Sequence, residues 1–404
     1  MDKEEANPFS LEGLIKKGGM KSIMAKSMYI GVGGVAKKVK NIYIGVDGKA
    51  RKVKKGYIGV GGVARLFYSI GAQGTISRHS HPTMTPTWSY ATTWVPGANA
   101  GAGTYAVFGG GETIRSRATN IVVSFDKDLT ISEPTGLSAS RYWAAPASLG
   151  KYALFAGGRD NNANKYTNVD TYDDKLTKGT VDLTYSRQEM SSATIGNYAL
   201  FAGGQTKNAK CEAVSSSLTV TTVSDLSSQK YWTYMSNGGT NVVNYALFAG
   251  GSSTNNVDTY NVSLTKGTAT ALSESRQANS AGTIGNYALV AGGENNGVTT
   301  ATVDVYNSSL TKGNNLSLSV ARRYMAVATT PEHVLFICGD NDGYSSDVID
   351  AFDMSLTRTL PQVLLDDRLG AGASTVGDYI LIVGGHPGAI SQTRDSIEIY
   401  KYSV

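Results

Sequence analysis

The stretch YALFAGG at residues 198–204 is one of seven related copies that decide the fold of this 404-residue chain. The copies begin at Tyr105, Tyr152, Tyr198, Tyr245, Tyr287, His333 and Tyr379, at intervals of 42 to 47 residues. A period of this length is typical of units that bury their hydrophobic faces only against neighbouring units. Seven units of about four short strands fit a closed ring, so the sequence predicts an all-β, seven-bladed β-propeller.

Each repeat contains an apolar run, a Gly-Gly pair, a polar loop and a strand of alternating polarity. The apolar run, 198–202 in the third copy, predicts the innermost strand, buried on both faces. Strands such as VDTY at 169–172 alternate in polarity, which predicts a single buried face. The last copy ends after IEIY at 397–400, one strand short, so we expect residues 74–81 to supply the closing strand.

The repeat resembles the kelch family of β-propellers over residues 90–404. The resemblance is carried by the double glycine, the tyrosine of the VDTY-type strands, and an arginine 11 residues before the tyrosine of the apolar run. These arginines are Arg141, Arg187, Arg276, Arg322 and Arg368. The tryptophan that usually follows the V-x-x-Y strand is replaced by LTKG, so the chain is a divergent relative. The resemblance implies that the arginines have a structural role, bonding within or between blades.

A second, 14-residue repeat precedes the first one. Its copies open with YIGV at Tyr29, Tyr43 and Tyr57, and each continues through a Gly-Gly or Asp-Gly turn into a second strand. Such turns between two β-type runs predict tight hairpins, and three hairpins would form a small meander. We therefore expect an anchor or flexible segment at 1–28, a β-hairpin module at 29–70 and the propeller at 71–404.

The hairpin module is basic and the remainder of the chain is slightly acidic. Residues 1–70 hold 14 Lys and Arg against 5 Asp and Glu, whereas the rest holds 23 against 27. This asymmetry suggests separate roles, with the basic face acting as a solvated surface or as a docking surface for an acidic partner. The docking candidates are Lys37, Lys38, Lys40, Arg51, Lys52, Lys54 and Lys55. We do not expect nucleic-acid binding, because interleaved aromatics and a recognition helix are missing.

Several functional classes find no support in the sequence. Cys211 and Cys338 are too few for a disulfide framework, and no apolar run is long enough to span a membrane. Residues 1–9 are acidic where a signal peptide would be basic, so we expect synthesis without export by that route. The H-x-H pair His79 and His81 needs further ligands to bind a metal. No catalytic motif stands out, so we expect no cofactor, no metal and no catalysis.

The loops after each Gly-Gly vary in length and are rich in polar residues, as binding loops on a rigid scaffold often are. In a propeller all of them project from one face, where their side chains suit hydrogen bonding to sugar hydroxyls or to a protein surface. The ligand-binding candidates are Arg159, Asp160, Asn161, Asn162, Asn295, Asn296, Asp340, Asn341, Asp342, Tyr344 and His386.

The 14-residue repeat resembles one found in tail and other structural proteins of phages and prophages of Gram-positive bacteria. The resemblance implies a virion component assembled in the host cytoplasm, present in several copies or as a homo-oligomer. Residues 1–70 would dock on other virion proteins, and the propeller would bind a host-surface glycan or protein. Two alternatives remain open: a glycan-degrading enzyme that uses the propeller pocket, and an intracellular scaffold of the kelch type.

Overall fold

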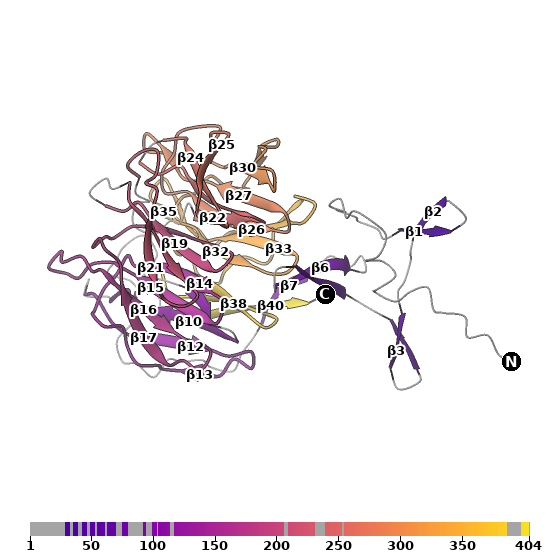
Figure 1. Ribbon diagram of the computed structural model, residues 1–404, viewed down its shortest axis with the longest axis horizontal. Helices are drawn as coiled ribbons and strands as arrows, with labels where there is room; N and C mark the ends of the chain where they lie inside the picture. Colours follow the sequence, from indigo (N-terminus) through magenta and orange to yellow (C-terminus); the bar gives the residue numbers. More distant parts are fainter. Residues whose placement is uncertain are drawn as a thin grey trace. The chain divides into compact units, whose positions relative to one another are not determined.

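The computed structural model describes residues 75–79 and 104–403, apart from 114–116, 206–208, 231–238, 253 and 386–396, together with the strands within 29–69, 92–93 and 99–102. All of the described elements are β-strands or the turns and loops between them (Figure 1). The chain divides into two compact units, residues 1–72 and residues 73–404. The fold is therefore all-β, as the sequence predicts.

The first unit contains the three predicted hairpins. They pair β1 (Tyr29–Val32) with β2 (Val35–Lys38), β3 (Tyr43–Val46) with β4 (Lys49–Lys52), and β5 (Lys55–Val60) with β6 (Val63–Ser69). Among the described strands each hairpin is a two-stranded sheet of its own, so the expected meander is wrong. The second strands VAKK and KARK carry positive charge, which disfavours pairing along their free edges.

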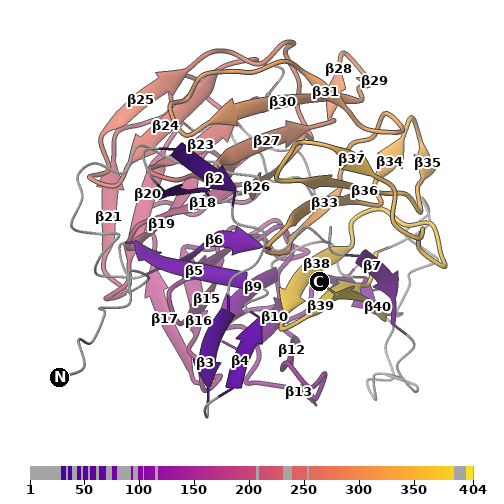
Figure 2. The same ribbon diagram turned by 90° about the vertical axis from the view of Figure 1, so that its right-hand side faces the viewer.

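The second unit is a seven-bladed β-propeller, in which the described residues form seven four-stranded antiparallel sheets around an axis (Figure 2). From blade 1 to blade 7, the first strands are β9 (Asn99–Ala102), β14 (Ala145–Leu149), β18 (Ser191–Ile195), β22 (Gly239–Val242), β26 (Ser280–Ile284), β32 (Ala326–Thr329) and β38 (Gly372–Val376). The second strands are β10 (Tyr105–Gly109), β15 (Tyr152–Ala156), β19 (Tyr198–Ala202), β23 (Tyr245–Ala249), β27 (Tyr287–Ala291), β33 (His333–Ile337) and β39 (Tyr379–Val383).

The third and fourth strands complete each blade. The third strands are β12 (Val122–Phe125), β16 (Asn168–Tyr172), β20 (Cys211–Ser215), β24 (Val257–Asn261), β30 (Thr302–Asn307), β36 (Ile349–Asp353) and β40 (Ile397–Ser403). The fourth are β13 (Ile131–Ser132), β17 (Lys178–Asp182), β21 (Val220–Val223), β25 (Lys266–Ala269), β31 (Leu316–Ser317), β37 (Arg358–Thr359) and, in blade 7, β7 (Thr75–Arg78).

The apolar YALF strand is the second strand of its blade, so its predicted position next to the axis is wrong. The first strands of neighbouring blades contact one another instead, for example β14 with β18 and β22 with β26. Seven strands converge there, and the space favours small residues. A Cβ atom added at Gly282 of β26 would lie 2.6 Å from Val334 of the next blade. Alanine, serine, threonine and glycine therefore occupy most of the first strands.

The predicted double burial of the YALF strand is present, and it joins the blades. In β19, Ala199 and Phe201 pack into the core shared with blade 2, while Leu200 and Ala202 pack into the core shared with blade 4. Seven such clusters of described residues lie between successive blades. They run from blade 1 to blade 7 and back to blade 1. Apolar burial on both faces explains why this run is apolar throughout.

The third strands are buried on both faces, contrary to the single buried face expected from their alternation. In β16 the residues from Val169 to Tyr172 are all buried, Asp170 included. An ionised carboxylate is buried at low cost only when it is paired. Arg141, also fully buried, donates to Asp170 at 2.7 Å and to the carbonyl of Phe155 on β15 at 2.9 Å.

The same pair recurs in blades 2 to 7, between the predicted arginine position and the third strand. The pairs are Arg141–Asp170, Arg187–Glu212, Lys230–Asp258, Arg276–Asp304, Arg322–Asp350 and Arg368–Glu398. The backbone N–H three residues before each basic residue also donates to the carboxylate, as Ser138 does to Asp170. The arginines thus have the structural role that the sequence analysis infers.

A second cation reaches the same carboxylate from the outer strand. In blades 2, 4 and 5 it is the lysine of the LTKG turn, as in Lys312–Asp304 at 2.9 Å. In blade 7 it is Arg78 of β7, 3.9 Å from Glu398. Blade 1 departs from the rule in sequence, because Trp94 and Val123 stand where the other blades have the basic residue and the acid. Both members of the pair are replaced together.

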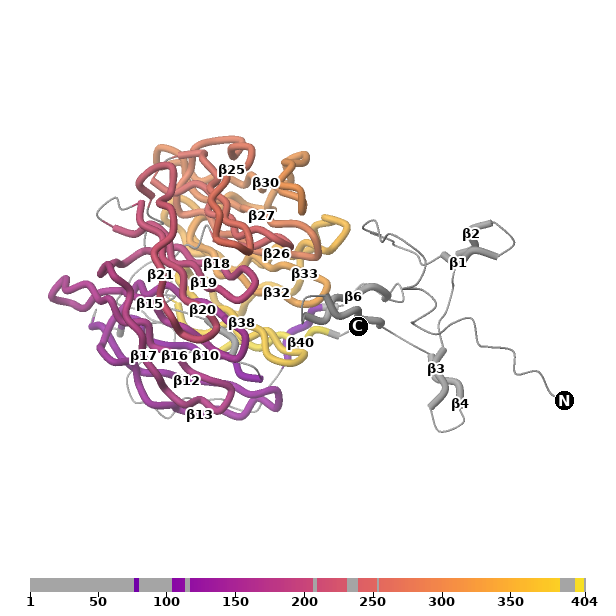
Figure 3. Tube along the Cα trace, in the orientation of Figure 1, coloured from indigo at the N-terminus to yellow at the C-terminus, as the bar shows by residue number. Residues whose placement is uncertain are grey.

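The ring closes through residues that precede the first blade. β7 pairs with β40 from Thr75 opposite Ser403 to Arg78 opposite Tyr400, within the segment 74–81 expected to close the ring. The first and last blades also share a core that includes Phe108 and Leu381. Figure 3 shows the yellow trace of β38 beside the purple trace of β10.

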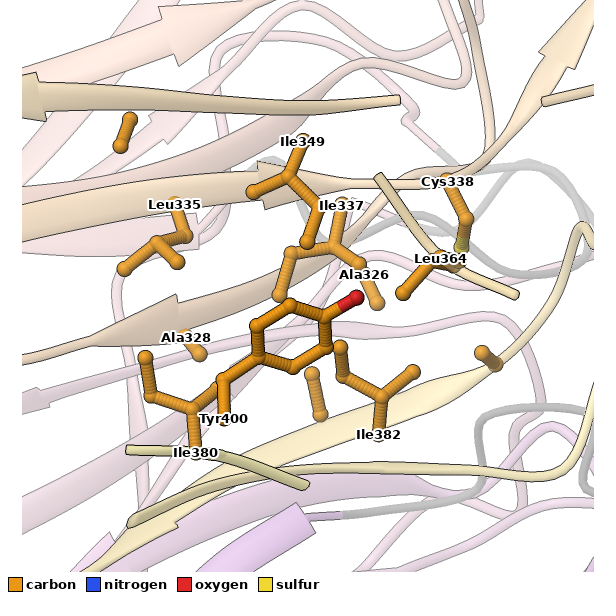
Figure 4. Packing of buried hydrophobic residues seen from close by; sticks show 13 residues of the cluster. Ala326, Ala328, Leu335, Ile337, Cys338, Ile349, Leu364, Ile380, Ile382 and Tyr400 are labelled. Carbon is orange, nitrogen blue, oxygen red and sulfur yellow. The ribbon is translucent and has the colours of Figure 1, made fainter. Parts of the chain in front are cut away.

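Blades 6 and 7 share the cluster shown in Figure 4, where the ring of Tyr400 lies among Ile337, Ile380 and Ile382. The Tyr400 hydroxyl donates to the carbonyl of Val363 at 2.9 Å. Burial raises the pKa of Tyr400 to about 12, so the hydroxyl remains a donor at neutral pH. The equivalent tyrosines of blades 2, 4 and 5 make the same bond to their own connectors.

The buried pairs give a first prediction. Replacing Asp304 by valine leaves Arg276 charged in the core without its main partner, which should destabilise the propeller by about 3–5 kcal/mol. The double variant Arg276→Met/Asp304→Val should recover most of that loss, because blade 1 already has two apolar residues at these positions. Urea denaturation measures both effects, with Lys127→Gln in an exposed pair as the control that should leave the midpoint unchanged. A double variant as unstable as the single one would contradict this account.

Closure gives a second prediction. Deleting residues 1–70 keeps β7 and should leave the thermal midpoint of the propeller nearly unchanged. Deleting residues 1–78 removes the fourth strand of blade 7 and the Arg78–Glu398 pair, so the midpoint should fall by about 5 °C or more. Circular dichroism at increasing temperature compares the two truncated proteins. Equal midpoints would show that β7 contributes little to closure.

Candidate functional site

The two ends of the propeller differ. One end, the loop face, carries the loops between second and third strands, which include 159–166, 294–300 and 340–346, and also the connectors between blades. The opposite end, the turn face, carries the short turns before the second strands, such as those at Gly150 and Gly285. Because Thr75 pairs with Ser403 at the end of β40, the chain enters the propeller at the turn face.

A rim on the loop face is built by the Gly-Gly pairs. Gly157 and Gly158 have φ of 60° and 93°, and a Cβ atom at Gly158 would lie 2.7 Å from the carbonyl oxygen of Tyr142. Only glycine allows this approach without strain. The residue after the glycines, Arg159, can then form a β-bridge with Tyr142, the residue after the repeat arginine.

The same juxtaposition places paired side chains around the loop face. In blade 3 the side-chain amide of Gln188 donates to that of Gln205, and in blade 5 that of Gln277 donates to Glu294 at 2.6 Å. The four described pairs, which we call the rim pairs, are Tyr142–Arg159, Gln188–Gln205, Gln277–Glu294 and Arg323–Asp340. The scaffold therefore fixes where these side chains lie and leaves their chemistry free to vary.

Arg323 is the centre of one cluster, between blades 5 and 6. Its Nε donates to Asp340 Oδ2 at 2.8 Å, and its Nη1 pairs with Glu294 of the preceding blade. Its guanidinium lies 5.0 Å from the ring centre of Tyr324. Arg323 and Tyr324 are both partly exposed, whereas the two carboxylates are almost buried. The cluster thus presents a guanidinium and an aromatic ring to solvent. The two nearly buried carboxylates hold the guanidinium in place.

Arg159 is the centre of a second cluster, between blades 1 and 2. Its Nε donates to the Tyr142 hydroxyl at 2.8 Å, and its guanidinium lies 4.5 Å from the ring centre of Trp143. Partial burial raises the pKa of Glu112 in blade 1, while the charge of Arg159 opposes that rise. This cluster shares with the one around Arg323 a guanidinium that lies beside an aromatic ring on the connector between blades.

Two hairpins project beside the Arg323 cluster. They are β28 (Glu294–Asn295) with β29 (Val298–Thr299), and β34 (Asp340–Asn341) with β35 (Tyr344–Ser345). Their turns have positive φ at Asn296–Gly297 and at Asp342–Gly343, as tight hairpins require. The Thr299 N–H donates to Asp342 Oδ1 at 3.2 Å, which ties one hairpin to the other. Tyr344, at the tip, is 78% exposed.

The structure divides the predicted loop residues into several groups. Arg159 is partly exposed on the rim and Tyr344 is exposed on its hairpin, whereas Asp340 is buried beside Arg323. Asp160, Asn296 and Asp342 form turns. The Asp160 carboxylate accepts from the N–H groups of Asn162 and Asn164. A hydrogen bond from the Asn164 side chain holds the pKa of Asp160 below its usual value.

Asn161 accepts from the Ala118 N–H of the neighbouring blade at 2.6 Å, and Asn341 accepts from the Thr299 hydroxyl. Asn295 lies on β28, and Asn162 is exposed. His386 lies outside the described residues. Of the docking candidates, Lys37, Lys38, Arg51, Lys52 and Lys55 lie on strands of the hairpin unit, while Lys40 and Lys54 lie outside the described residues.

Several rim residues escape the sequence analysis, which considers only the loops after Gly-Gly. Tyr142, Trp143, Arg323 and Tyr324 directly follow the repeat arginines, on the connectors between blades. Their constant offset from the arginine is a signal that could have found them. Glu112 and Glu294 directly follow the glycines, like Arg159, so they belong to the loops that the sequence analysis considers but are not among its candidates.

Within the described ranges no group of three or more His, Cys, Asp or Glu side chains is arranged to hold a metal ion. His81 lies outside those ranges, and His79 packs against Tyr379 with ring centres 5.1 Å apart. A search of the same residues finds no helix of the length and apolarity that a membrane span requires. Cys211 and Cys338 are buried free thiols, and Cys338 keeps the positive φ of the glycine that it replaces, so blade 6 is not distorted there.

No protein-family profile matches the chain, and no curated protein matches it in sequence at a significant level.

His333, at the repeat tyrosine position, gives a third prediction. It is buried, with its ring 6.0 Å from that of Tyr402, and burial lowers its pKa while Asp353 and Glu332 oppose the shift. The unfolded chain therefore binds a proton more readily, so stability should fall as the pH drops below about 6.5. His333→Tyr, the residue of the other blades, should remove about 1–3 °C of the decrease in thermal midpoint between pH 7 and pH 5. His79→Gln serves as control, and an unchanged pH profile for His333→Tyr would exclude this role.

Proposed function

We propose that the protein is a non-catalytic adhesion and structural component of a phage virion. In this proposal the basic hairpin unit docks on other virion proteins, and the loop face binds a glycan or protein of the host surface. The resemblance of the 14-residue repeat to phage structural proteins, and of the propeller to the kelch family, agrees with this assignment. The protein would be present in several copies on the particle, assembled in the host cytoplasm.

The observation that carries the proposal is the polarity of the propeller. The chain from the hairpin unit enters at Thr75 on the turn face, and the rim pairs and hairpins lie at the opposite end. The proposed attachment through residues 1–70 therefore joins the propeller at the end opposite the proposed ligand face. The rim also combines two features of binding sites, namely aromatic rings and a few hydrogen-bond donors and acceptors that are held in place by their partners.

The state of the rim carboxylates favours binding over catalysis. Asp340 and Glu294 both pair with Arg323, and Glu294 also accepts from Gln277. Carboxylates held in this way serve as fixed hydrogen-bond acceptors. A general acid or base would need one of them to exchange protons with a substrate at working pH.

A truncation tests the two halves of this proposal separately. Deleting residues 1–70 should abolish incorporation into particles, as measured by mass spectrometry of purified virions. The same truncated protein, labelled with a fluorophore, should still bind the surface of Gram-positive host cells. The double variant Arg323→Ala/Tyr344→Ala in the full chain should show the reverse behaviour, with normal incorporation and cell binding weakened about tenfold or more.

Four results would refute the proposal. Incorporation of the truncated protein would refute the docking role, and unchanged cell binding of the double variant would refute the role of the loop face. Shortening of surface glycans by the purified protein would show an enzyme instead. Co-purification with a soluble host protein, together with absence from virions, would show an intracellular scaffold.

A further inference from the structure

We propose that the loop face recognises an uncharged, hydroxyl-rich glycan through two subsites, one at Trp143 and Arg159 and the other at Tyr324 and Arg323. This inference rests on the proposed adhesion function and names the ligand class and the contact residues. It starts from the fact that two places on the rim have the same construction although their sequences differ.

The aromatic residues of the two subsites are not required by the fold. Trp143 and Tyr324 stand two residues after a repeat arginine, and both have a φ of 57°. The equivalent residues Ala278 in blade 5 and Gly370 in blade 7 have φ of 57° and 69°. The backbone is therefore left-handed at this position whatever the side chain. A bulky aromatic is unfavourable in that conformation, and such strain is concentrated at functional sites.

Each aromatic ring lies beside a guanidinium. Arg159 lies 4.5 Å from the ring centre of Trp143 and donates to the Tyr142 hydroxyl, and Arg323 lies 5.0 Å from that of Tyr324 and pairs with Glu294 and Asp340. An acidic ligand would have to compete with Glu294 and Asp340 for Arg323. A cationic ligand would have to displace both arginines from the aromatic rings. The arrangement therefore disfavours a charged ligand that must contact both places.

A ligand can still bond to lone pairs of the carboxylate oxygens and to N–H groups of the guanidinium groups. It can also contact the edges of the aromatic rings. Sugar hydroxyls both donate and accept, so they match a surface that offers donors and acceptors side by side. The C–H faces of a sugar ring pack on aromatic surface. Arg323, whose side chain is 22% exposed between two nearly buried acids, shows that the polar groups can be reached from solvent.

The positions of the subsites favour a chain of sugars over a single one. The Trp143 subsite belongs to blades 1 and 2, and the Tyr324 subsite to blades 5 and 6. Blades 3 and 4 separate them on one side of the ring and blade 7 on the other (Figure 2). One oligosaccharide that reaches both subsites binds the second one at a high effective concentration, which raises the affinity without any new contact.

The experiment uses full-length protein and the glycans of cells that it binds. Surface glycans are released, separated by anion exchange into a neutral and an acidic pool, and divided by size. Each fraction then competes with labelled protein for binding to the cells. The variants are Trp143→Ala, Tyr324→Ala and the double variant, which introduce the residue that blade 5 already has at Ala278. Lys151→Ala on the turn face is the control.

The neutral pool should compete, and its long fractions should do so at about tenfold lower concentration than its short fractions. Each single variant should weaken binding to cells about tenfold, and the double variant should abolish it, with circular dichroism and thermal midpoint unchanged. Competition by the acidic pool alone, or by neither pool while the protein still binds cells, would overturn the inference and leave the adhesion proposal intact. Equal competition by short and long fractions would overturn the two-subsite arrangement. Failure of the unmodified protein to bind cells would instead refute the adhesion proposal.

Discussion

The buried pair between a connector arginine or lysine and a third-strand carboxylate is the interaction on which the propeller depends. Arg276 and Asp304 are both fully buried, so each charge is tolerated only because the other is present. Asp304 also accepts from Ser273 and lies 2.9 Å from Lys312, so one carboxylate joins a connector, a third strand and an outer turn. Because this pair recurs in six blades, the connectors follow the same path from blade to blade, as the strands do.

The regular connectors determine the candidate binding surface. The basic residue is fixed inside the blade, so the next residue meets the one that follows Gly-Gly, as Tyr142 meets Arg159 and Gln277 meets Glu294. The residue after that has a positive φ and points the chain into the first strand of the next blade. Side chains at these positions lie in none of the seven apolar clusters between blades. They can vary from blade to blade, which is how a repetitive scaffold acquires an asymmetric rim.

The sequence predicts the ring because the repeat of 42 to 47 residues indicates seven similar units, and the apolar run in each unit indicates a strand buried on both faces. It misplaces that strand by one, because the true first strand consists of small residues such as those of Ser191–Ile195, whose pattern is weak. The carboxylate of VDTY looks solvent-facing in an alternating strand, and only its recurrence 25 to 30 residues after the arginine or lysine of six blades could reveal the pair. In the loops, Asp160 and Asp342 have the composition of a binding site but make turns. The rim aromatics Trp143 and Tyr324 lie on connectors, where composition gives no signal.

The same ion pair also takes part in closing the ring. Arg78 of β7 takes the place that a turn lysine has in blade 5, so the closing strand completes the charge cluster of blade 7 as well as its sheet. β7 begins at the turn face with Thr75. Under the proposed attachment through residues 1–70, tension would enter the propeller at Thr75 and load the hydrogen bonds between β7 and β40 in shear. A strand supplied from the other end of the chain, at the outer edge of blade 7, is therefore well placed to bear load.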